Sequence, residues 1–578
     1  MHSSRTPLRL ILWSPFWTAV TVFGMLLALS RAEAATINAA STALSDVVSA
    51  INSASDGDTV IVPAGTASWT SVITITKGIT LQGATTVTNT GKQNAIATDL
   101  TVIEDDSPLN TNNSGLINAT LTPIQNFHLT GFTFTSGSRT STNDIGAVHL
   151  ISTGNSPHFN MRVDHCHFDH IYGRNIQTDG WVYGVADHNY IEAQGNGQSV
   201  YINCANYGGY TQGHGAWADY PWFGTNKFFF IEDNTIVGNG IVPTSGAIDA
   251  EYGGRFVVRH NYFQNARPGW HGTEGGNRGC RAVEIYDNAY DWTLMFSALM
   301  RSGTALVHDN NWISAPQSAF NHNNMVIFRA NSGVPANTPY GPADGTDPWD
   351  VNDTEGNGTN VDGYSPYLFT SGTASSSAGP SGTQATMTDT SKNWTPNQLA
   401  GCSIKQTNPS AASYGKASYI ISNTANTITF YCYVSGDRGP TLLFAPRDAY
   451  EIHRVLICLD QPGRGKGDLL TGATTPLNTV TGTRQWPHQA LEPAMSWNNI
   501  YTPTNIAVGY DSGGTPTEVE GRDYFNLGKG FSADSTPSQV ASVYVAALNG
   551  VNYLGPFVYP HPLVSGTPTA PSNLRVTN

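Results

Sequence analysis

The sequence predicts an all-β protein whose body is a right-handed parallel β-helix, with an N-terminal capping helix and an inserted small β-module. One six-residue pattern recurs six times, at intervals that suit the coils of a solenoid. Charged residues make up only 12% of the chain, and 59 glycines lie among Ser, Thr and Asn between short apolar runs. This composition is typical of strands joined by tight turns, and it leaves little room for long amphipathic helices.

The chain begins with the features of an export signal. Two arginines precede an apolar run from Leu10 to Leu29, and Ala32-Glu33-Ala34 then provides the small residues that signal peptidase requires. We therefore expect a signal peptide over residues 1–34 and a secreted or extracellular protein, at the cell surface or in the periplasm. An uncleaved anchor is the alternative, but Pro15 interrupts the run, and no membrane segment is expected after cleavage.

A helix and several short strands are expected next. Apolar residues from Leu44 to Ile51 recur at i, i+3, i+4 and i+7, which indicates one face of a helix, and Gly57 follows as a stop signal. Residues 59–65, 72–76 and 79–83 read as brief strands separated by turns. A helix over the open end of a stack of strands would hide edges that otherwise aggregate.

The six-residue repeat is the main evidence for the β-helix. Its copies occupy residues 163–168, 186–191, 231–236, 258–263, 285–290 and 307–312, with fourth positions at Cys166, Asn189, Asn234, Asn261, Asn288 and Asn310. The fourth positions are 23, 45, 27, 27 and 22 residues apart, and we expect the 45-residue gap to hide one extra turn through Ser199–Cys204. Stacked Asn side chains can donate and accept along the stack, and Asn tolerates a left-handed backbone at a bend.

The repeat also sets the expected domain boundaries. The β-helix is expected over residues 35–369, and Ser/Thr/Gly-rich sequence then predicts the inserted β-module over residues 370–450. The repeat pattern returns at Trp497–Ile500, so residues 451–566 are expected to form C-terminal coils or a cap. Residues 567–578 resemble a linker and the start of a fibronectin type III-like domain.

Six cysteines follow the expected signal peptide, where export permits oxidation. No Cys-x-x-Cys occurs, which argues against a thiolate zinc site. We expect a disulfide between Cys402 and Cys432 that closes the inserted module.

The formal net charge of −14 limits the possible partners. A phosphate backbone would be repelled and no basic cluster offsets this, so nucleic acid is excluded as a partner. An acidic polysaccharide would meet the same repulsion unless local arginines or a bound cation reversed the field at the site.

Two segments resemble the pectate lyase superfamily, and the resemblance extends over roughly residues 36 to 330. Arg162–Phe168 is similar to the family's Trp-Ile-Asp-His-Cys-Ser-Phe segment, and Ser245–Asp249 is similar to its Asp-Gly-Leu-Ile-Asp strand. The resemblance implies a β-helix enzyme that cleaves uronic-acid polymers, with Asp164 and Asp249 in a calcium-binding region. Ser245 stands where the family carries a further Asp, so a complete acidic cage is not visible.

The family's Arg-x-Pro-x-x-Arg element supplies a catalytic and a substrate-binding Arg, and Arg267-Pro-Gly-Trp-His271 matches it loosely. Elimination from a uronate needs a base near the abstracted proton and a positive centre for the developing enolate. The expected catalytic residues are Arg267, His271, Arg281 and Glu251, with Arg278 binding substrate. A free Arg titrates above about 12, so a basic role would need a strongly perturbed site. Pairing of these arginines with carboxylates on a solvated strand face is the alternative.

Asp249 and Glu251 also allow a hydrolase. Two residues apart on one strand, they share a face with Cα atoms roughly 6.6 Å apart, which suits an acid and a base or nucleophile. Two exposed acids on a sheet face are the structural alternative.

Histidines form a further candidate metal site. His165 and His167 are expected to share one strand face, with His170 and the acids Asp164 and Asp169 adjacent. Histidines stacked along the β-helix are the simpler explanation.

The long segment from Tyr207 to Phe230 is rich in aromatic residues. Aromatic faces stack on sugar rings, so we expect substrate-binding positions at Trp217, Tyr220, Trp222 and Trp270. The alternative is a hydrophobic lid over the coils.

The leading hypothesis is therefore a secreted polysaccharide lyase acting on acidic, uronic-acid-containing glycans, with calcium as a candidate cofactor. A polysaccharide hydrolase and a non-catalytic glycan-binding surface or adhesion protein are the alternatives. The enzyme hypothesis predicts that the catalytic candidates converge on one solvent-facing groove, namely Asp249, Glu251, Arg267, His271 and Arg281.

Overall fold

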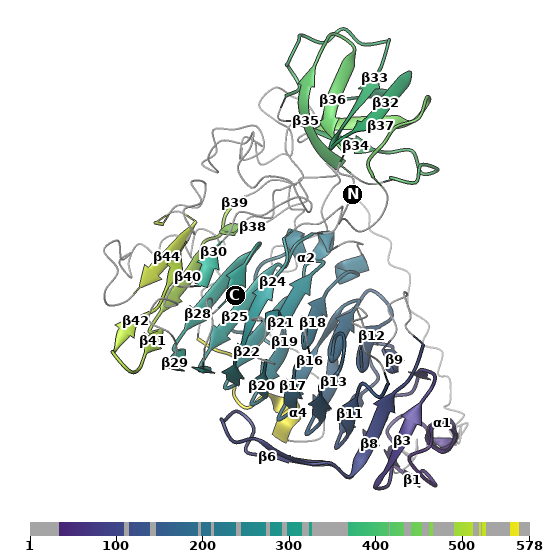
Figure 1. The fold of residues 1–578 in the computed structure, drawn as a ribbon, viewed down its shortest axis with the longest axis vertical. Coiled ribbons are helices and arrows are strands. Elements are labelled where there is room, and N and C mark those ends of the chain that lie inside the picture. The colour runs from purple at the N-terminus through teal and green to yellow at the C-terminus, as the bar shows by residue number, and fades with distance from the viewer. Residues whose placement is uncertain are drawn as a thin grey trace, which may run out of the picture. The chain divides into compact units, whose positions relative to one another are not determined.

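The structure is a computed structural model that places many parts of the chain (Figure 1). It describes residues 34–108, 115–138, 146–194, 198–209, 213–238, 244–272, 278–291, 298–314, 323–325, 368–400, 402–414, 417–432, 441–453, 462–465, 490–511, 520–521, 523–527 and 555–565. The signal peptide expected over residues 1–34, apart from its last residue, and the linker expected over residues 567–578 lie outside these ranges. None of the helices in the described part of the chain has the length and apolarity needed to cross a bilayer.

Three long, mainly parallel sheets confirm the predicted parallel β-helix, because successive strands of the chain enter the sheets in turn (Figure 1). Sheet A has twelve strands. They are β1 (Thr36–Asn38), β2 (Thr59–Ile61), β5 (Thr80–Gln82), β10 (Phe127–Thr130), β13 (His158–Asp164), β16 (Val182–Asp187), β19 (Phe229–Glu232), β22 (Arg255–Arg259), β25 (Ala282–Tyr286), β28 (Thr304–His308), β40 (Ala494–Trp497) and β44 (Tyr524–Leu527).

Sheets B and C have eleven and ten strands. Sheet B contains β3 (Gly65–Trp69), β8 (Thr101–Asp105), β11 (Thr133–Thr135), β14 (His167–Asp169), β17 (Tyr190–Glu192), β20 (Thr235–Val237), β23 (Tyr262–Gln264), β26 (Ala289–Asp291), β29 (Asn311–Ser314), β41 (Ile500–Tyr501) and β42 (Ile506–Ala507). Sheet C contains β4 (Ile73–Ile75), β9 (Ile117–Leu121), β12 (Val148–Ser152), β15 (Ile176–Asp179), β18 (Val200–Asn203), β21 (Thr244–Glu251), β24 (Ala266–Trp270), β27 (Leu299–Met300), β30 (Asn323–Met325) and β43 (Tyr510–Asp511).

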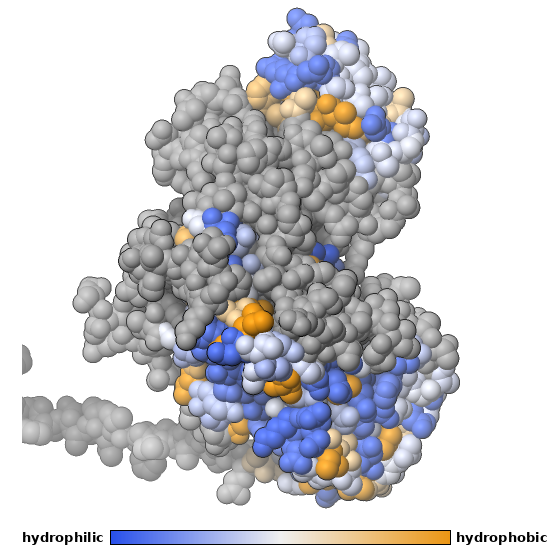
Figure 2. Space-filling model, turned by 60° about the vertical axis from the view of Figure 1, so that its left-hand side comes forward, coloured by the Kyte–Doolittle hydropathy of each residue, from blue (hydrophilic) through white to orange (hydrophobic). Residues whose placement is uncertain are grey.

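The core lies between the three sheets, because alternate residues of each strand point inward. Ile, Val, Leu and Phe fill it, and aromatic rings stack from coil to coil. The rings of Phe263, Tyr290 and Trp312 follow one another with centroids 5.1 and 4.8 Å apart. On the face shown in Figure 2, the described surface is largely hydrophilic, with apolar residues in small separate patches. Polar side chains therefore occupy many of the outward positions of the strands.

The Asn ladder forms as predicted. Each Asn Nδ2 donates to the Oδ1 of the Asn one coil further on, at 2.8 to 3.1 Å, from Asn189 through Asn234, Asn261, Asn288 and Asn310 to Asn499. Each of these Oδ1 atoms also accepts the backbone N–H of the Asn one coil earlier, at 2.9 to 3.1 Å. Asn499 belongs to the motif at Trp497–Ile500, so the chain does return to the stack there.

The left-handed backbone lies one residue earlier than expected. The residue before each ladder Asn has a φ between 51° and 56°, and these residues are His188, Asp233, His260, Asp287, Asp309 and Asn498. This bend turns the following Asn side chain inward, where it can reach the neighbouring coils. Each bend therefore contains a left-handed residue, as predicted, but that residue is the one before the Asn and not the Asn itself.

The 45-residue gap does not hide an extra turn. β16 pairs directly with β19, and Asn189 bonds directly to Asn234, so a single coil separates them. The expected extra strand, β18, is the sheet C strand of that coil. The added length is the connection from β18 to β19, which contains the 3₁₀ turn η1 (Tyr207–Gly209) and α2 (His214–Ala218).

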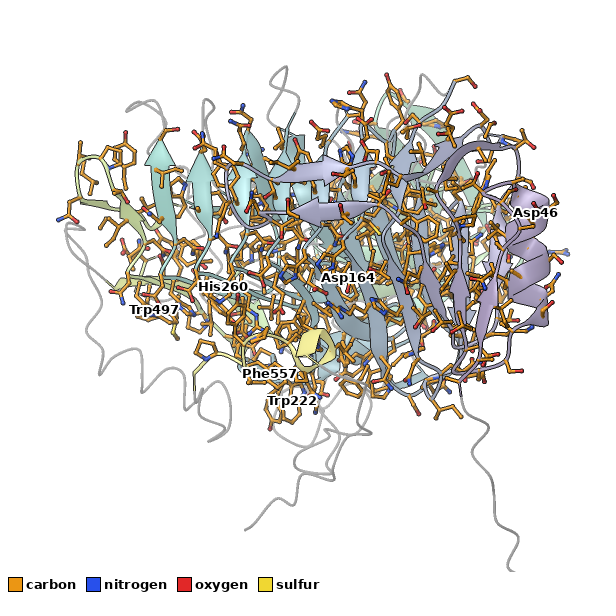
Figure 3. The ribbon with its side chains drawn as sticks, turned by 90° about the horizontal axis from the view of Figure 1, so that it is seen from below. Asp46, Asp164, Trp222, His260, Trp497 and Phe557 are labelled. Carbon is orange, nitrogen blue, oxygen red and sulfur yellow. The ribbon has the colours of Figure 1, made fainter. Side chains whose placement is uncertain are left out.

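Helix α1 (Leu44–Ser53) caps the N-terminal end of the stack, as predicted, and Figure 3 shows it with Asp46 at the opposite end from Trp497. Val47, Ala50 and Ile51 are its buried residues. Lys77 Nζ donates to the carbonyls of Ile51, Asn52 and Ala54 at 2.6 to 3.1 Å, which satisfies acceptors that the end of a helix leaves open.

The C-terminal segment, residues 555–565, packs on the outer face of sheet A and contains the short helix α4 (Pro562–Ser565). Arg259 donates to the carbonyls of Phe557 and Val558 at 2.7 and 2.9 Å. The backbone N–H of His561 donates to Glu232 at 2.8 Å. Figure 3 shows Phe557 near Trp222 and His260 on this side of the molecule. The segment therefore supplies partners for charged residues that face outward from β19 and β22.

The predicted module is an antiparallel sheet of seven strands with its own core. In spatial order they are β31 (Leu368–Thr373), β37 (Ala449–His453), β34 (Ser403–Gln406), β35 (Ala417–Asn423), β36 (Thr427–Tyr431), β33 (Gln384–Thr388) and β32 (Ser376–Ser381). Two small antiparallel pairs complete the described strands, β6 (Thr86–Thr88) with β7 (Ile96–Thr98) and β38 (Arg464–Gly465) with β39 (Ala490–Leu491).

The expected disulfide between Cys402 and Cys432 is wrong, since the structure contains no bond between them. Cys402 adjoins β34 and Cys432 adjoins β36, and β35 lies between these two strands. Two strand spacings amount to about 9.6 Å, more than the roughly 7 Å that a disulfide can span between Cα atoms.

We expect replacement of Asn261 by Leu to destabilise the fold by roughly 1 to 3 kcal/mol. The Asn261 amide donates to Asn288 and to the carbonyls of Ile231 and Arg259, and Leu would leave these buried acceptors without their donor. Urea unfolding measures the change. Asn155→Leu, at an exposed position between β12 and β13, is the matched control. Equal stability of the wild type and Asn261→Leu would contradict a buried ladder.

We also expect acid to destabilise the fold through His158. Burial lowers the pKa of His158 to about 4, and its Nε2 hydrogen bonds the Gln125 carbonyl at 2.6 Å. In the unfolded chain His158 has a pKa near 6.5, so the unfolded state binds this proton first as the pH falls. The contribution of His158 to the free energy of unfolding is therefore fully present above pH 6.5 and is lost between pH 6.5 and 4. Between pH 7.5 and 5 the wild type should lose about 2 kcal/mol more than His158→Gln in urea unfolding. An identical decrease in the free energy of unfolding on acidification of both proteins would show that His158 is not the cause.

Candidate functional site

The outer face of sheet C carries an unusual concentration of polar and charged side chains. The strand register aligns one outward residue from each of five successive coils, namely Asn118, His149, Gln177, Tyr201 and Asp249. The next outward positions include Asp179, Asn203 and Glu251. Core residues such as Ile202 and Ala250 lie between the two rows and face inward. Strand alternation therefore gathers residues from distant parts of the sequence onto one face.

Asp249 and His271 form the closest pair of candidate catalytic groups. His271 Nδ1 lies 2.9 and 2.8 Å from the two carboxylate oxygens of Asp249. The strand pairing explains the contact, because His271 follows β24 directly and its backbone N–H donates to the Ala250 carbonyl. The His271 side chain is 18% exposed, whereas that of Asp249 is 3% exposed. His271 is thus the member of the pair that reaches solvent.

A hydrogen-bonded chain continues from Asp249 across the face. Gln198 Nε2 donates to Asp249 at 2.5 Å, and Arg174 Nε donates to Gln198 Oε1 at 2.6 Å. Arg174 also donates to Gln177 at 2.9 Å, and its guanidinium lies 3.5 Å from the centroid of the Tyr201 ring. These contacts fix the position of Asp249 from the side opposite His271.

Glu251 occupies the same face of β21 as Asp249. It accepts a hydrogen bond from the Tyr201 hydroxyl at 2.6 Å. Burial is the largest cause that raises the pKa of Tyr201, and the Glu251 charge raises it further. Tyr201 therefore stays protonated and donates to the carboxylate.

Arg267 lies on β24, beside β21, and its side chain is among the buried charged groups. Burial and, to a smaller extent, the charge of Arg301 lower the pKa of Arg267 to about 10. Arg301 donates to the Trp270 carbonyl at 3.1 Å. The guanidinium groups of Arg267 and Arg301 therefore lie close enough to interact at this edge of sheet C.

The expected convergence is incomplete. Asp249, Glu251, Arg267 and His271 lie on two adjacent strands of sheet C, but the first three are at most 5% exposed. A face buried to this degree is not the open groove that the sequence predicted.

Arg281 lies elsewhere. It is fully buried, donates to the Asp219 carbonyl at 2.8 Å and pairs with Glu492. Arg281 thus binds the start of the segment that follows α2, and the structure does not bring it together with Asp249 and His271. The Arg278 guanidinium lies 4.7 Å from the Trp217 ring centroid, again at that connection.

Three of the expected sugar-binding aromatic residues have no exposed ring. Trp217, Tyr220 and Trp270 are each at most 1% exposed. Trp270 belongs to the core between the sheets, and its Nε1 donates to the Ser302 carbonyl at 2.9 Å. Trp222 is partly exposed, with Lys227 Nζ 3.3 Å from its ring centroid. The segment from Tyr207 to Phe230 is therefore closer to the hydrophobic lid that was the alternative.

The residues do not fit the expected calcium region. Asp164 lies on β13 of sheet A, where Arg162 is 2.6 Å and His128 is 3.0 Å away. Asp249 lies on sheet C, with its oxygens facing His271 and Gln198. Because the two carboxylates lie on different sheets and each faces nitrogen donors, they do not form one oxygen cage for calcium.

Sequence reasoning missed Arg174, Gln198 and the role of Tyr201. The alternation in Ser199–Cys204 could have placed Tyr201 on the outer face with Asn203. Gln198 and Arg174 lie just before strands, and no spacing or motif marks them.

Comparisons with known proteins add no family assignment. No protein-family model, no curated protein and no solved structure matches the chain. The class of protein is therefore defined by the fold alone, a parallel β-helix with a polar face on sheet C.

Proposed function

We propose that the chain is a polysaccharide lyase that cleaves uronic-acid-containing glycans by β-elimination, resembling the pectate lyase superfamily. The single observation that carries the proposal is the Asp249–His271 pair, and Arg267 lies on β24, the strand that His271 follows. The Asp249 carboxylate lies against His271 Nδ1 and favours the tautomer that carries its hydrogen there, in which Nε2 is the basic nitrogen of the ring. His271 is also the partly exposed member of the group.

In this proposal His271 removes the proton next to the uronate carboxylate, and Arg267 stabilises the negative charge that develops there. The carbon–oxygen bond to the linked sugar then breaks as the C=C bond forms, and the leaving oxygen takes a proton from water. A pKa of about 10 keeps Arg267 charged at neutral pH. Burial makes this charge more effective, because water screens it less. Asp249 orients the imidazole and balances the positive charge that His271 acquires.

The local charge supports an acidic substrate despite the net charge of −14. Arg267 and Arg301 lie close enough that Arg301 lowers the pKa of Arg267. An acidic glycan outside the cell also agrees with the export signal that the sequence predicts.

A hydrolase that uses Asp249 and Glu251 is the second candidate, because both acids share one face of β21. Each carboxylate already accepts a hydrogen bond, from His271 and from Tyr201 respectively. These contacts favour orienting roles over a free acid and nucleophile, so the lyase proposal comes first.

The deciding experiment incubates the full-length protein with pectate, alginate and other acidic glycans, with and without a chelator. Ultraviolet absorbance detects unsaturated uronate ends, and a reducing-sugar assay detects hydrolysis. Unsaturated ends support the lyase. New reducing ends without ultraviolet absorbance would favour the hydrolase, and binding without either product would favour a glycan-binding surface protein.

We expect Arg267→Lys to lower kcat by about 100-fold or more while folding and glycan binding persist. Lys keeps the charge but loses the planar fork that can grip a carboxylate. Arg162→Lys is the matched control, because Arg162 pairs with Asp187 on sheet A. Wild-type turnover by Arg267→Lys, or an equal loss in both variants, would argue against a specific role for Arg267.

We expect Asp249→Asn to lose activity that added calcium does not restore. The substitution removes the carboxylate that holds His271 and leaves an amide of nearly the same size. The measurement is the elimination rate over a range of calcium concentrations, with metal-free protein as the baseline. Recovery at high calcium would show instead that Asp249 is a metal ligand.

A further inference from the structure

A second group of potential ligands lies on the outer face of sheet B, on a different sheet from Asp249 and His271. His167 and Asp169 come from β14, and Glu192 comes from β17. One ligand atom from each of the three residues lies within 4.8 Å of the others.

The strand register explains why these side chains meet. His167 and Asp169 are two residues apart and share the outer face, while Phe168 between them points into the core. Asp169 pairs directly with Glu192 across the two parallel strands. Like charges at directly paired positions repel, so this arrangement favours a cation between them.

A polar residue outside the group contacts each of the three side chains. His167 Nδ1 lies 2.8 Å from Asp99, and the Tyr190 hydroxyl donates to Glu192 Oε1 at 3.0 Å. His170 Nδ1 lies 2.5 Å from Asp169. Protein metal sites commonly hold a ligating histidine by its other nitrogen against a carboxylate, and they orient ligating carboxylates by hydrogen bonds. The supporting contacts leave His167 Nε2 and Glu192 Oε2 facing each other at 2.9 Å.

We propose that His167, Asp169 and Glu192 bind one divalent transition-metal ion, for which zinc is the best match. One imidazole nitrogen and two carboxylate oxygens are a donor set that zinc accepts, with water in a fourth position. The ion takes the place of the hydrogen between His167 Nε2 and Glu192. Because its ligands come from β14 and β17, the ion joins two successive coils of the β-helix.

This site differs from the histidine cluster that the sequence suggested. His165 has a φ of 46°, lies at the bend and stacks on His188 with ring centroids 5.1 Å apart. Asp164 faces Arg162 on sheet A. The expectation that His165 and His167 share a strand face is therefore wrong, because the bend separates them. Glu192, from the next coil, completes the set instead.

The test is zinc titration of the metal-free full chain by calorimetry, with calcium and magnesium titrated in parallel. We expect one zinc ion to bind the wild type, and Glu192→Gln and Asp169→Asn to weaken its binding by about ten-fold or more. Asp291→Asn is the matched control, since Asp291 lies on the same face of sheet B and accepts a hydrogen bond from Tyr262, with no ion pair to a histidine among the described residues. Calcium and magnesium should bind more weakly than zinc, because they prefer oxygen ligands.

Thermal melting provides the second measurement. Zinc should raise the melting temperature of the wild type and of Asp291→Asn but not that of Glu192→Gln or Asp169→Asn. Equal zinc binding by the wild type and by both ligand variants would overturn the proposal. An equal loss in Asp291→Asn, or calcium binding as tight as zinc binding, would also overturn it. Glycan turnover does not enter this test, so the proposal and the lyase proposal can fail separately.

Discussion

The rest of the structure depends on one constraint, the stacking of coils in fixed register through the buried Asn ladder. Each Asn side chain bonds to the coils on both sides, so a coil cannot slip along its neighbour without breaking several buried hydrogen bonds. A slip by one residue would also move every core residue to the outside. The left-handed residue before each Asn sets the bend, and the bend directs the Asn inward. Register at this corner therefore fixes which side chains line up on all three sheets.

Both proposed sites are consequences of that alignment. On sheet C, adjacent strands β21 and β24 bring His271 against Asp249, although 22 residues separate them. On sheet B, the same pairing rule brings Glu192 of one coil beside Asp169 of the previous one. A β-helix thus builds a site from residues one coil apart, and the connections between strands can vary without disturbing it. Buried arginines on the outer faces have a structural role, which is to bind chain segments that cross the sheets. Arg259 and Arg281 hold chain segments that cross the outside, the C-terminal segment in one case and the connection after α2 in the other.

Local sequence patterns were enough to predict the repeating architecture. The capping helix, the Asn positions, the inserted β-module and the return at Trp497–Ile500 all follow from local patterns, because strand alternation, helix periodicity and the bend motif each need only a few neighbouring residues. The antiparallel pairing of the module is seen only in the structure. The sequence analysis also singled out as site candidates most of the residues on the outer face of β21 and β24. It could not give the partners Gln198 and Arg174, since these come from positions before strands that carry no periodic signal.

Which candidate residues share a site depends instead on contacts between strands and coils. Asp164 and Asp249 both fit an acidic motif, yet they lie on different sheets, because a motif does not say on which side of the coil it falls. Arg281 and Trp217 were expected at a substrate surface, yet both are fully buried, Trp217 within the long β18–β19 connection and Arg281 against it. Cys402 and Cys432 were kept apart by β35. Conversely, Glu192 became a candidate metal ligand only through pairing with the previous coil. In each case the deciding contact joins residues from different strands or coils, and a contact of that kind depends on register and burial, which local sequence patterns do not encode.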